Sequence, residues 1–191
     1  MFTELLGQIV DRLDGSPWAG ATGRHAPPAK PPLYTTEERL RRDATPWTLV
    51  QGLLAPFQFV VFLVSLGLVI RFLVTGSGEG AATASIVAKT LVLYTIMVTG
   101  AIWEREVFGR YLFAPAFYWE DMVSMVVIAL HTAYLAALLS GTLSSTNLML
   151  LALAAYATYV INAVQFILKL RAARKQTARA WVPSVGLGAA S

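Results

Sequence analysis

Four long apolar stretches constrain the fold of this chain more than any other feature of its sequence. They lie at about residues 49–73, 81–102, 122–139 and 148–170. About 20 apolar residues are enough for a helix to cross the hydrocarbon core of a bilayer, since each residue adds about 1.5 Å along the axis. The pattern therefore predicts an all-α, polytopic membrane protein. We expect a bundle of four transmembrane helices with short amphipathic or interfacial helices beside it.

The composition supports a membrane protein. Charged residues make up 14% of the chain and hydrophobic residues 56%, whereas about a quarter of a soluble chain is usually charged. Such a chain has too little polar surface to face water on all sides. Cysteine is absent, which excludes disulfides, thiolate metal sites and a cysteine nucleophile.

The basic residues predict the orientation in the membrane. They gather before the first apolar stretch, between the second and third, and after the fourth. The other two connections, residues 74–80 and 140–147, contain no lysine or arginine. Because basic loops stay on the cytoplasmic side, we expect both termini to be cytoplasmic and the protein to lie in the cytoplasmic membrane. This topology accounts for the basic charge without nucleic acid as a partner.

The apolar pattern also suggests how the chain is divided. Residues 1–34 are predicted to be a flexible extension, with a short amphipathic helix over Met1–Leu13. Residues 35–174 are predicted to form the membrane domain, and residues 175–191 a flexible tail. Within the membrane domain, Thr35 and Glu38 have the spacing of a capping box, which predicts a short charged helix over Thr36–Asp43.

Among the polar residues within the apolar stretches, Lys89 and His131 each have a functional and a structural interpretation. Lys89 could bind a carboxylate, or it could pair with an acid or a backbone carbonyl. His131 could ligate a metal or transfer a proton, or it could make a hydrogen bond between helices. Both residues are candidates for ligand binding.

Acidic residues stand at the start of the third stretch. Glu120 lies eleven residues before His131, about three helical turns, so the two share a helix face with Ser124 and Tyr134. The adjacent carboxyl groups of Glu120 and Asp121 at the membrane boundary could include one that acts as a general acid. The alternative is stabilisation of the helix N-terminus, which also favours acids.

The connection before these acids is unusually aromatic. The segment Trp103–Asp121 reads WEREVFGRYLFAPAFYWED and contains seven aromatic residues beside charged ones. An aromatic belt at the membrane interface explains one or two aromatic residues per helix end, but not seven. The excess suggests a site for a large, flat, apolar ligand with an acidic group, at the cytoplasmic face of the membrane.

Three segments, Arg41–Pro56, Val87–Leu135 and Tyr156–Arg174, resemble the 3-vinyl (bacterio)chlorophyllide hydratase family of photosynthetic bacteria, also called 2-vinyl bacteriochlorophyllide hydratase. The resemblance covers about Tyr34–Arg174, and its most specific part is the pattern WE-x3-FG-x-YLFAPAF-x-WED. It implies hydration of the 3-vinyl group of chlorophyllide a or bacteriochlorophyllide a to a 1-hydroxyethyl group, a hydro-lyase step of bacteriochlorophyll biosynthesis. We therefore expect a cytoplasmic or intracytoplasmic photosynthetic membrane, where the protein could associate with other pigment-biosynthesis enzymes.

This reaction needs a proton donor and water, and we expect no cofactor, since the chain has no nucleotide, zinc or nucleophile motif. We hypothesise that Glu120 or Asp121 is the catalytic acid, with Glu104 as the next candidate. The remaining candidates are expected to bind the pigment. The arginines would bind its carboxylate, and His131 could ligate its magnesium. We expect the protein to have no metal ion of its own. These substrate-binding candidates are His131, Arg110, Arg105, Lys89, Tyr111, Phe117 and Trp119.

Two other functions fit parts of the sequence. A non-catalytic pigment-binding or photosystem assembly protein would use the same aromatic residues and His131, but it would need no acid. A small transporter or channel subunit would use Lys89 and His131, but it should also have polar stripes on several spans.

Overall fold

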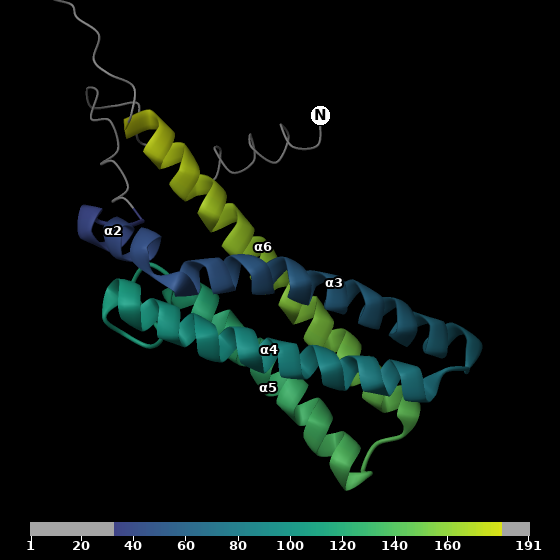
Figure 1. Ribbon diagram of the computed structural model, residues 1–191. Coiled ribbons are helices and arrows are strands. Elements are labelled where there is room, and N and C mark those ends of the chain that lie inside the picture. Colours follow the sequence, from purple (N-terminus) through teal and green to yellow (C-terminus); the bar gives the residue numbers. More distant parts are fainter. Residues whose placement is uncertain (1–32, 181–191) are drawn as a thin grey trace, which may run out of the picture. The chain divides into compact units, whose positions relative to one another are not determined.

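A computed structural model describes residues 33–180, all helices and short connections (Figure 1). The predicted extension and its amphipathic helix lie outside the described residues, as does most of the predicted tail. In chain order the helices are α2 (Thr36–Ala44), α3 (Pro46–Thr75), α4 (Glu79–Phe108), α5 (Tyr118–Ser140) and α6 (Ser145–Ala180).

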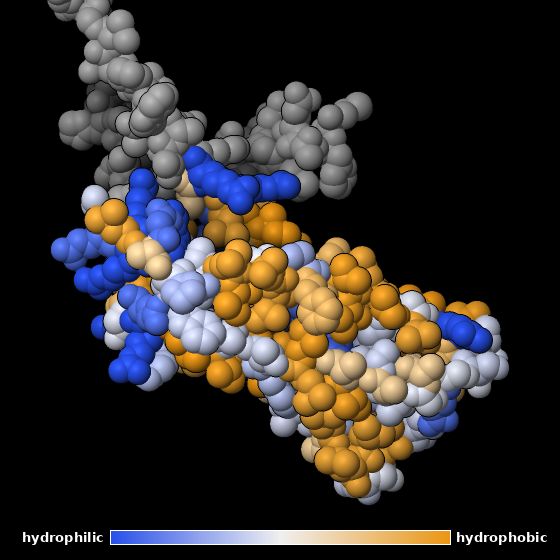
Figure 2. Space-filling view, in the orientation of Figure 1, coloured by the Kyte–Doolittle hydropathy of each residue, from blue (hydrophilic) through white to orange (hydrophobic). Residues whose placement is uncertain are grey.

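Four of these helices, α3 to α6, are long and apolar enough to cross a membrane. The all-α fold with four spanning helices is therefore confirmed for the described part of the chain. Large apolar side chains remain exposed along the helices, and Figure 2 shows them covering the sides of the bundle, with polar residues gathered where α2 lies. Exposed leucine, valine and phenylalanine side chains are expected on a surface that faces lipid.

The helices pack most extensively in the pairs α3 with α4 and α5 with α6, while α2 lies against α4. Most buried residues of the shared interior are apolar, among them Phe62, Val69, Ile86, Val127 and Met149. A second, smaller group of buried residues, Tyr34, Val107 and Phe117, lies toward the end where α4 is joined to α5.

The capping box is confirmed. The Glu38 amide N–H donates to Thr35 Oγ1 at 3.2 Å, and the Thr35 N–H donates to Glu38 Oε2 at 2.7 Å. The resulting helix, α2, ends at Ala44, one residue beyond the predicted end. Pro46 then occupies the first turn of α3, where its missing N–H leaves no hydrogen bond unmade.

All four spanning helices extend further than the apolar pattern, and α4, α5 and α6 do so by four or more residues at one end. Helix α4 continues past residue 102 to Phe108, α5 begins at Tyr118 rather than 122, and α6 runs to Ala180, into the segment predicted to be tail. Glutamate, arginine and alanine are good helix formers, so a helix rich in them can continue beyond the end of its apolar stretch. Helix α4 stops at Gly109, which adopts φ 77°, a left-handed conformation that glycine accepts without strain. Because α4 and α5 both extend beyond their apolar stretches, the connection between them is short and covers residues 109–117.

Candidate functional site

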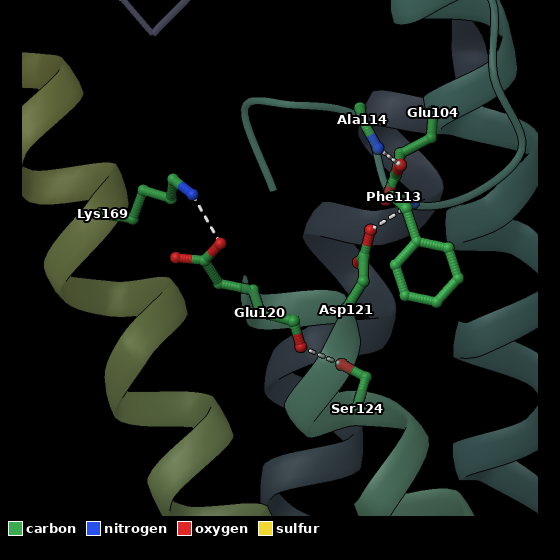
Figure 3. Close-up of polar contacts among 7 residues, drawn as sticks. All are labelled: Glu104, Phe113, Ala114, Glu120, Asp121, Ser124 and Lys169. Atoms are coloured by element: carbon green, nitrogen blue, oxygen red, sulfur yellow. Dashed lines mark hydrogen bonds and ion pairs between the residues drawn. The ribbon is translucent and has the colours of Figure 1, made fainter. Parts of the chain in front are cut away.

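Four charged side chains from three helices meet where α4 is joined to α5, and we call Glu104, Glu120, Asp121 and Lys169 the rim cluster (Figure 3). The three acids are buried: Glu104 is 6% exposed, Glu120 8% and Asp121 4%. The sequence singled out the same three acids as catalytic candidates. The structure places all three in one cluster.

Glu104 and Asp121 face each other across the connection. The Ala114 N–H donates to Glu104 Oε2 at 3.3 Å, and the Phe113 N–H donates to Asp121 Oδ2 at 2.8 Å. The two carboxyl groups are buried beside each other. Burial and a neighbouring acid both disfavour the ionised form of a carboxyl group, so the protonated form is favoured in this pair. The pair is therefore suited to hold a transferable proton.

Glu120 has a different partner. The Lys169 ammonium donates to Glu120 Oε2 at 2.5 Å, and this lysine also lies 4.9 Å from the centre of the Phe117 ring. The rim cluster thus contains one acid in an ion pair with a lysine and one pair of acids buried beside each other.

The same carboxyl groups shape the connection. Phe113 adopts φ 59°, an uncommon conformation for a residue with a side chain, and its N–H is the group that Asp121 binds. Asp121 and Glu104 therefore have a structural role as acceptors from the loop. Asparagine and glutamine keep an acceptor oxygen but cannot carry the acidic proton, so these substitutions separate the two roles.

Aromatic side chains of the connection divide into an inner and an outer set. Phe117 is 3% exposed and packs against the rings of Trp103, Phe108 and Phe166, with Tyr34 stacked on Phe108. The predicted ligand-binding residue Phe117 is thus enclosed by other aromatic residues of the chain. The outer set differs: Trp119 is 71% exposed and Tyr111 is 53% exposed.

The two arginines predicted to hold a carboxylate are both exposed. The Arg105 guanidinium lies 4.6 Å from the centre of the Tyr111 ring and donates to its hydroxyl. Together with Ile102 and Glu106, these two residues line a hollow of about 480 Å³ at the surface. Arg110 does not line this hollow. The geometry therefore favours Arg105 over Arg110 as a carboxylate ligand.

Lys89 and His131 lie deeper, and we call them the intramembrane pair. Both are fully buried. Lys89 Nζ lies 3.9 Å from the centre of the Tyr159 ring and 5.6 Å from that of Tyr156, and no described residue makes a hydrogen bond with it. The aromatic faces are attractive to a cation but supply no conventional hydrogen bond.

The tautomer of His131 follows from its contacts. His131 Nδ1 lies 2.8 Å from the Val127 carbonyl oxygen, which can only accept, so Nδ1 carries the hydrogen. In the neutral ring Nε2 then has a free lone pair, and it meets no hydrogen-bond donor among the described residues. Such a nitrogen could ligate a magnesium ion. Asp121 and His131 are ten residues apart on α5, about 15 Å along its axis, so the intramembrane pair and the rim cluster are separate sites.

Sequence reasoning missed Lys169 as a site residue and treated it only as a topological charge. The signal that could have identified it is the polar spacing on the fourth span: Asn162, Gln165 and Lys169 recur at intervals of three and four, so they share a helix face. On an apolar helix such a stripe marks the side that meets other helices.

Comparisons with known proteins agree with the extent of this fold. Residues 34–172 match the family model of 2-vinyl bacteriochlorophyllide hydratase. A protein of that name from Rhodobacter capsulatus is 68% identical over 151 residues, which cover 79% of this chain and 88% of the relative. One from Cereibacter sphaeroides is 69% identical over 142 residues, covering 74% of this chain and 88% of the relative. No solved structure matches the chain.

Proposed function

The chain belongs to the 2-vinyl bacteriochlorophyllide hydratase family, and from this premise we propose that the rim cluster is where it adds water to the 3-vinyl group of chlorophyllide a or bacteriochlorophyllide a. It is a hydro-lyase of bacteriochlorophyll biosynthesis. The observation that supports the proposal is the buried pair of carboxyl groups, Glu104 and Asp121, because burial side by side favours the protonated form of a carboxyl group.

The reaction makes few demands on the protein. A proton adds to the terminal carbon of the vinyl group, and its π electrons form the new C–H bond. The positive charge left on the inner carbon is spread over the conjugated macrocycle. Water then forms the C–O bond and loses a proton, which gives the 1-hydroxyethyl group. The protein must supply an acid, a place for water and a binding surface for the ring.

The contacts of the three acids divide these roles. Burial favours the protonated form in the Glu104–Asp121 pair, so we assign the general acid to this pair. Glu120 forms an ion pair with Lys169, and we assign to Glu120 the role of accepting the proton that the water loses. The acid is therefore assigned to Asp121 or Glu104 rather than to Glu120, which also stood as a candidate from sequence.

The pigment carboxylate is assigned to Arg105, which lines the surface hollow with Tyr111. A guanidinium and a carboxylate form strong, charge-assisted hydrogen bonds, and the tyrosine ring offers a face to the macrocycle. The intramembrane pair is fully buried, so His131 could ligate the pigment magnesium only if the helices part. The rim cluster lies beside the surface, and for this reason we place the reacting vinyl group there.

Conservative substitutions test the assignment. Glu104→Gln and Asp121→Asn keep an acceptor for the loop N–H groups but cannot donate a carboxylic proton. We expect each to lower hydration about 1,000-fold, measured by chromatography of the pigments after membranes containing equal amounts of protein are incubated with each vinyl substrate. Glu79→Gln is the matched control, because Glu79 also accepts a side-chain hydrogen bond, from Ser145, at the opposite end of α4. Full activity in both rim variants would exclude the assignment.

A further inference from the structure

A polar stripe on α6 continues the rim cluster into the membrane. Asn162 Nδ2 donates to Ser124 Oγ on α5 at 2.8 Å, and Lys169 at the other end of the stripe binds Glu120. Gln165 lies between them on the same helix face. The stripe therefore runs along the contact between α5 and α6.

Two oxygen atoms in this stripe have no hydrogen-bond donor in the part of the chain that the structure describes. Asn162 Oδ1 and Gln165 Oε1 are buried and accept no hydrogen bond from any described residue. A buried acceptor left unpaired costs about 1–3 kcal/mol. The two residues are one helical turn apart, so their side chains are neighbours. A ligand that donates hydrogen bonds to these two oxygen atoms would remove that cost.

The orientation of the Asn162 amide is fixed by its neighbours. Ser124 Oγ donates its hydrogen to the Glu120 carbonyl oxygen at 2.9 Å, so it can only accept from Asn162. The group of Asn162 that faces Ser124 must then be the NH₂ group, which leaves Oδ1 as the free acceptor. A reversed amide would set two acceptors against each other.

The ligand that fits has two donors and is small. Water has two O–H donors, and buried water molecules typically bind polar groups that the protein leaves unsatisfied. We propose that Asn162 Oδ1 and Gln165 Oε1 bind the water molecule that is added to the vinyl group. This assignment rests on the proposed function, and it makes Asn162 and Gln165 the residues that position the nucleophile.

The arrangement balances the reaction. The Glu104–Asp121 pair gives its proton to the terminal vinyl carbon, and the vinyl π electrons form that C–H bond. The bound water has donated both hydrogens to amide oxygens, so its lone pair is free to form the C–O bond with the carbocation. The proton that the oxygen then loses passes to the Glu120 carboxylate. One water molecule is consumed, nothing is oxidised or reduced, and proton return to the carboxyl pair restores the protein.

The test separates protonation from water addition. In heavy water, reversible protonation of the vinyl group places deuterium on its terminal carbon even when no water is added, and mass spectrometry of the recovered vinyl pigment detects it. The variant is Gln165→Met, which keeps the length of the side chain but removes the acceptor. Gln165→Glu restores an acceptor oxygen. Gln51→Met is the matched control, since the Gln51 amide donates to Thr99 on α4.

We expect Gln165→Met to form product about 100-fold more slowly, with KM for the pigment changed by less than about twofold, because the water is misplaced while the pigment contacts remain. Deuterium should still enter the recovered vinyl pigment, Gln165→Glu should regain most of the rate, and Gln51→Met should behave as the wild type.

Two results would overturn the water site. One is normal hydration by Gln165→Met. The other is loss of deuterium entry together with hydration, which would show a defect in folding or in protonation. If the wild-type protein itself neither hydrates the pigment nor exchanges deuterium, the proposed function fails instead.

Discussion

The rim cluster and the intramembrane pair are both buried groups of ionisable residues, but they are stabilised in opposite ways. At the rim each acid has a partner: a loop N–H for Glu104 and Asp121, and an ammonium for Glu120. In the interior, Lys89 Nζ and His131 Nε2 meet no hydrogen-bond partner among the described residues. From this difference we infer that the rim ion pair contributes to helix packing, whereas burial of Lys89 without a hydrogen-bond partner among the described residues costs stability.

The largest expected effect comes from breaking the ion pair at the rim. Lys169→Met leaves the Glu120 carboxylate buried without its cation, and we expect the free energy of unfolding in detergent to fall by about 3 kcal/mol. The double variant Glu120→Gln with Lys169→Met removes both charges, so most of the stability should return while hydration stays low. Equal stability of the Lys169 variant and the wild type would show that the pair does not stabilise the protein.

A smaller effect of opposite sign is expected in the interior. A charged lysine inside a membrane helix costs about 3 kcal/mol, and its contacts with aromatic rings offset about 2 kcal/mol. Lys89→Met should therefore raise the free energy of unfolding by about 1 kcal/mol, seen as a higher midpoint in thermal unfolding. A lower midpoint would mean that Lys89 has a stabilising partner, and the contrast between the two regions would then be wrong.

The smallest effect is expected at the outer aromatic surface. Trp119 is 71% exposed, as an interfacial aromatic residue would be. Trp119→Leu should change hydration by less than about twofold, because this side chain lies outside the cluster that holds the acids. A loss of pigment affinity, measured as a rise in KM, would instead show that Trp119 contacts the pigment, as the sequence predicted.

The sequence predicts the features of the fold that depend on neighbouring residues in the chain. The spans follow from hydropathy and the start of α2 follows from the capping box at Thr35. The meeting of Glu104 with Asp121 could not be predicted in the same way, because it depends on how α4 and α5 pack. In a soluble protein an apolar stripe marks the packed face of a helix. In a membrane, lipid-facing and protein-facing sides are both apolar, so only scattered polar residues such as Asn162 indicate which side is inner.

The tautomer of His131 could not be predicted from the sequence either. The residue was singled out for its position within a span, but its tautomer depends on the Val127 carbonyl, a backbone contact one turn earlier on the same helix. That contact needs a side-chain rotamer, which spacing alone does not define. Lys169 was missed for a related reason, since a basic residue at the end of a span already satisfies the topology rule.

We expect the Glu104–Asp121 pair to carry a proton at neutral pH, and infrared spectroscopy can detect that proton. A protonated carboxyl group has a C=O stretching band separate from that of carboxylates, and the band shifts in heavy water. We predict such a band in the wild-type protein and its loss in both Glu104→Gln and Asp121→Asn, with Glu79→Gln unchanged. A wild-type spectrum with only ionised carboxylates would show that the pair holds no proton and cannot be the general acid.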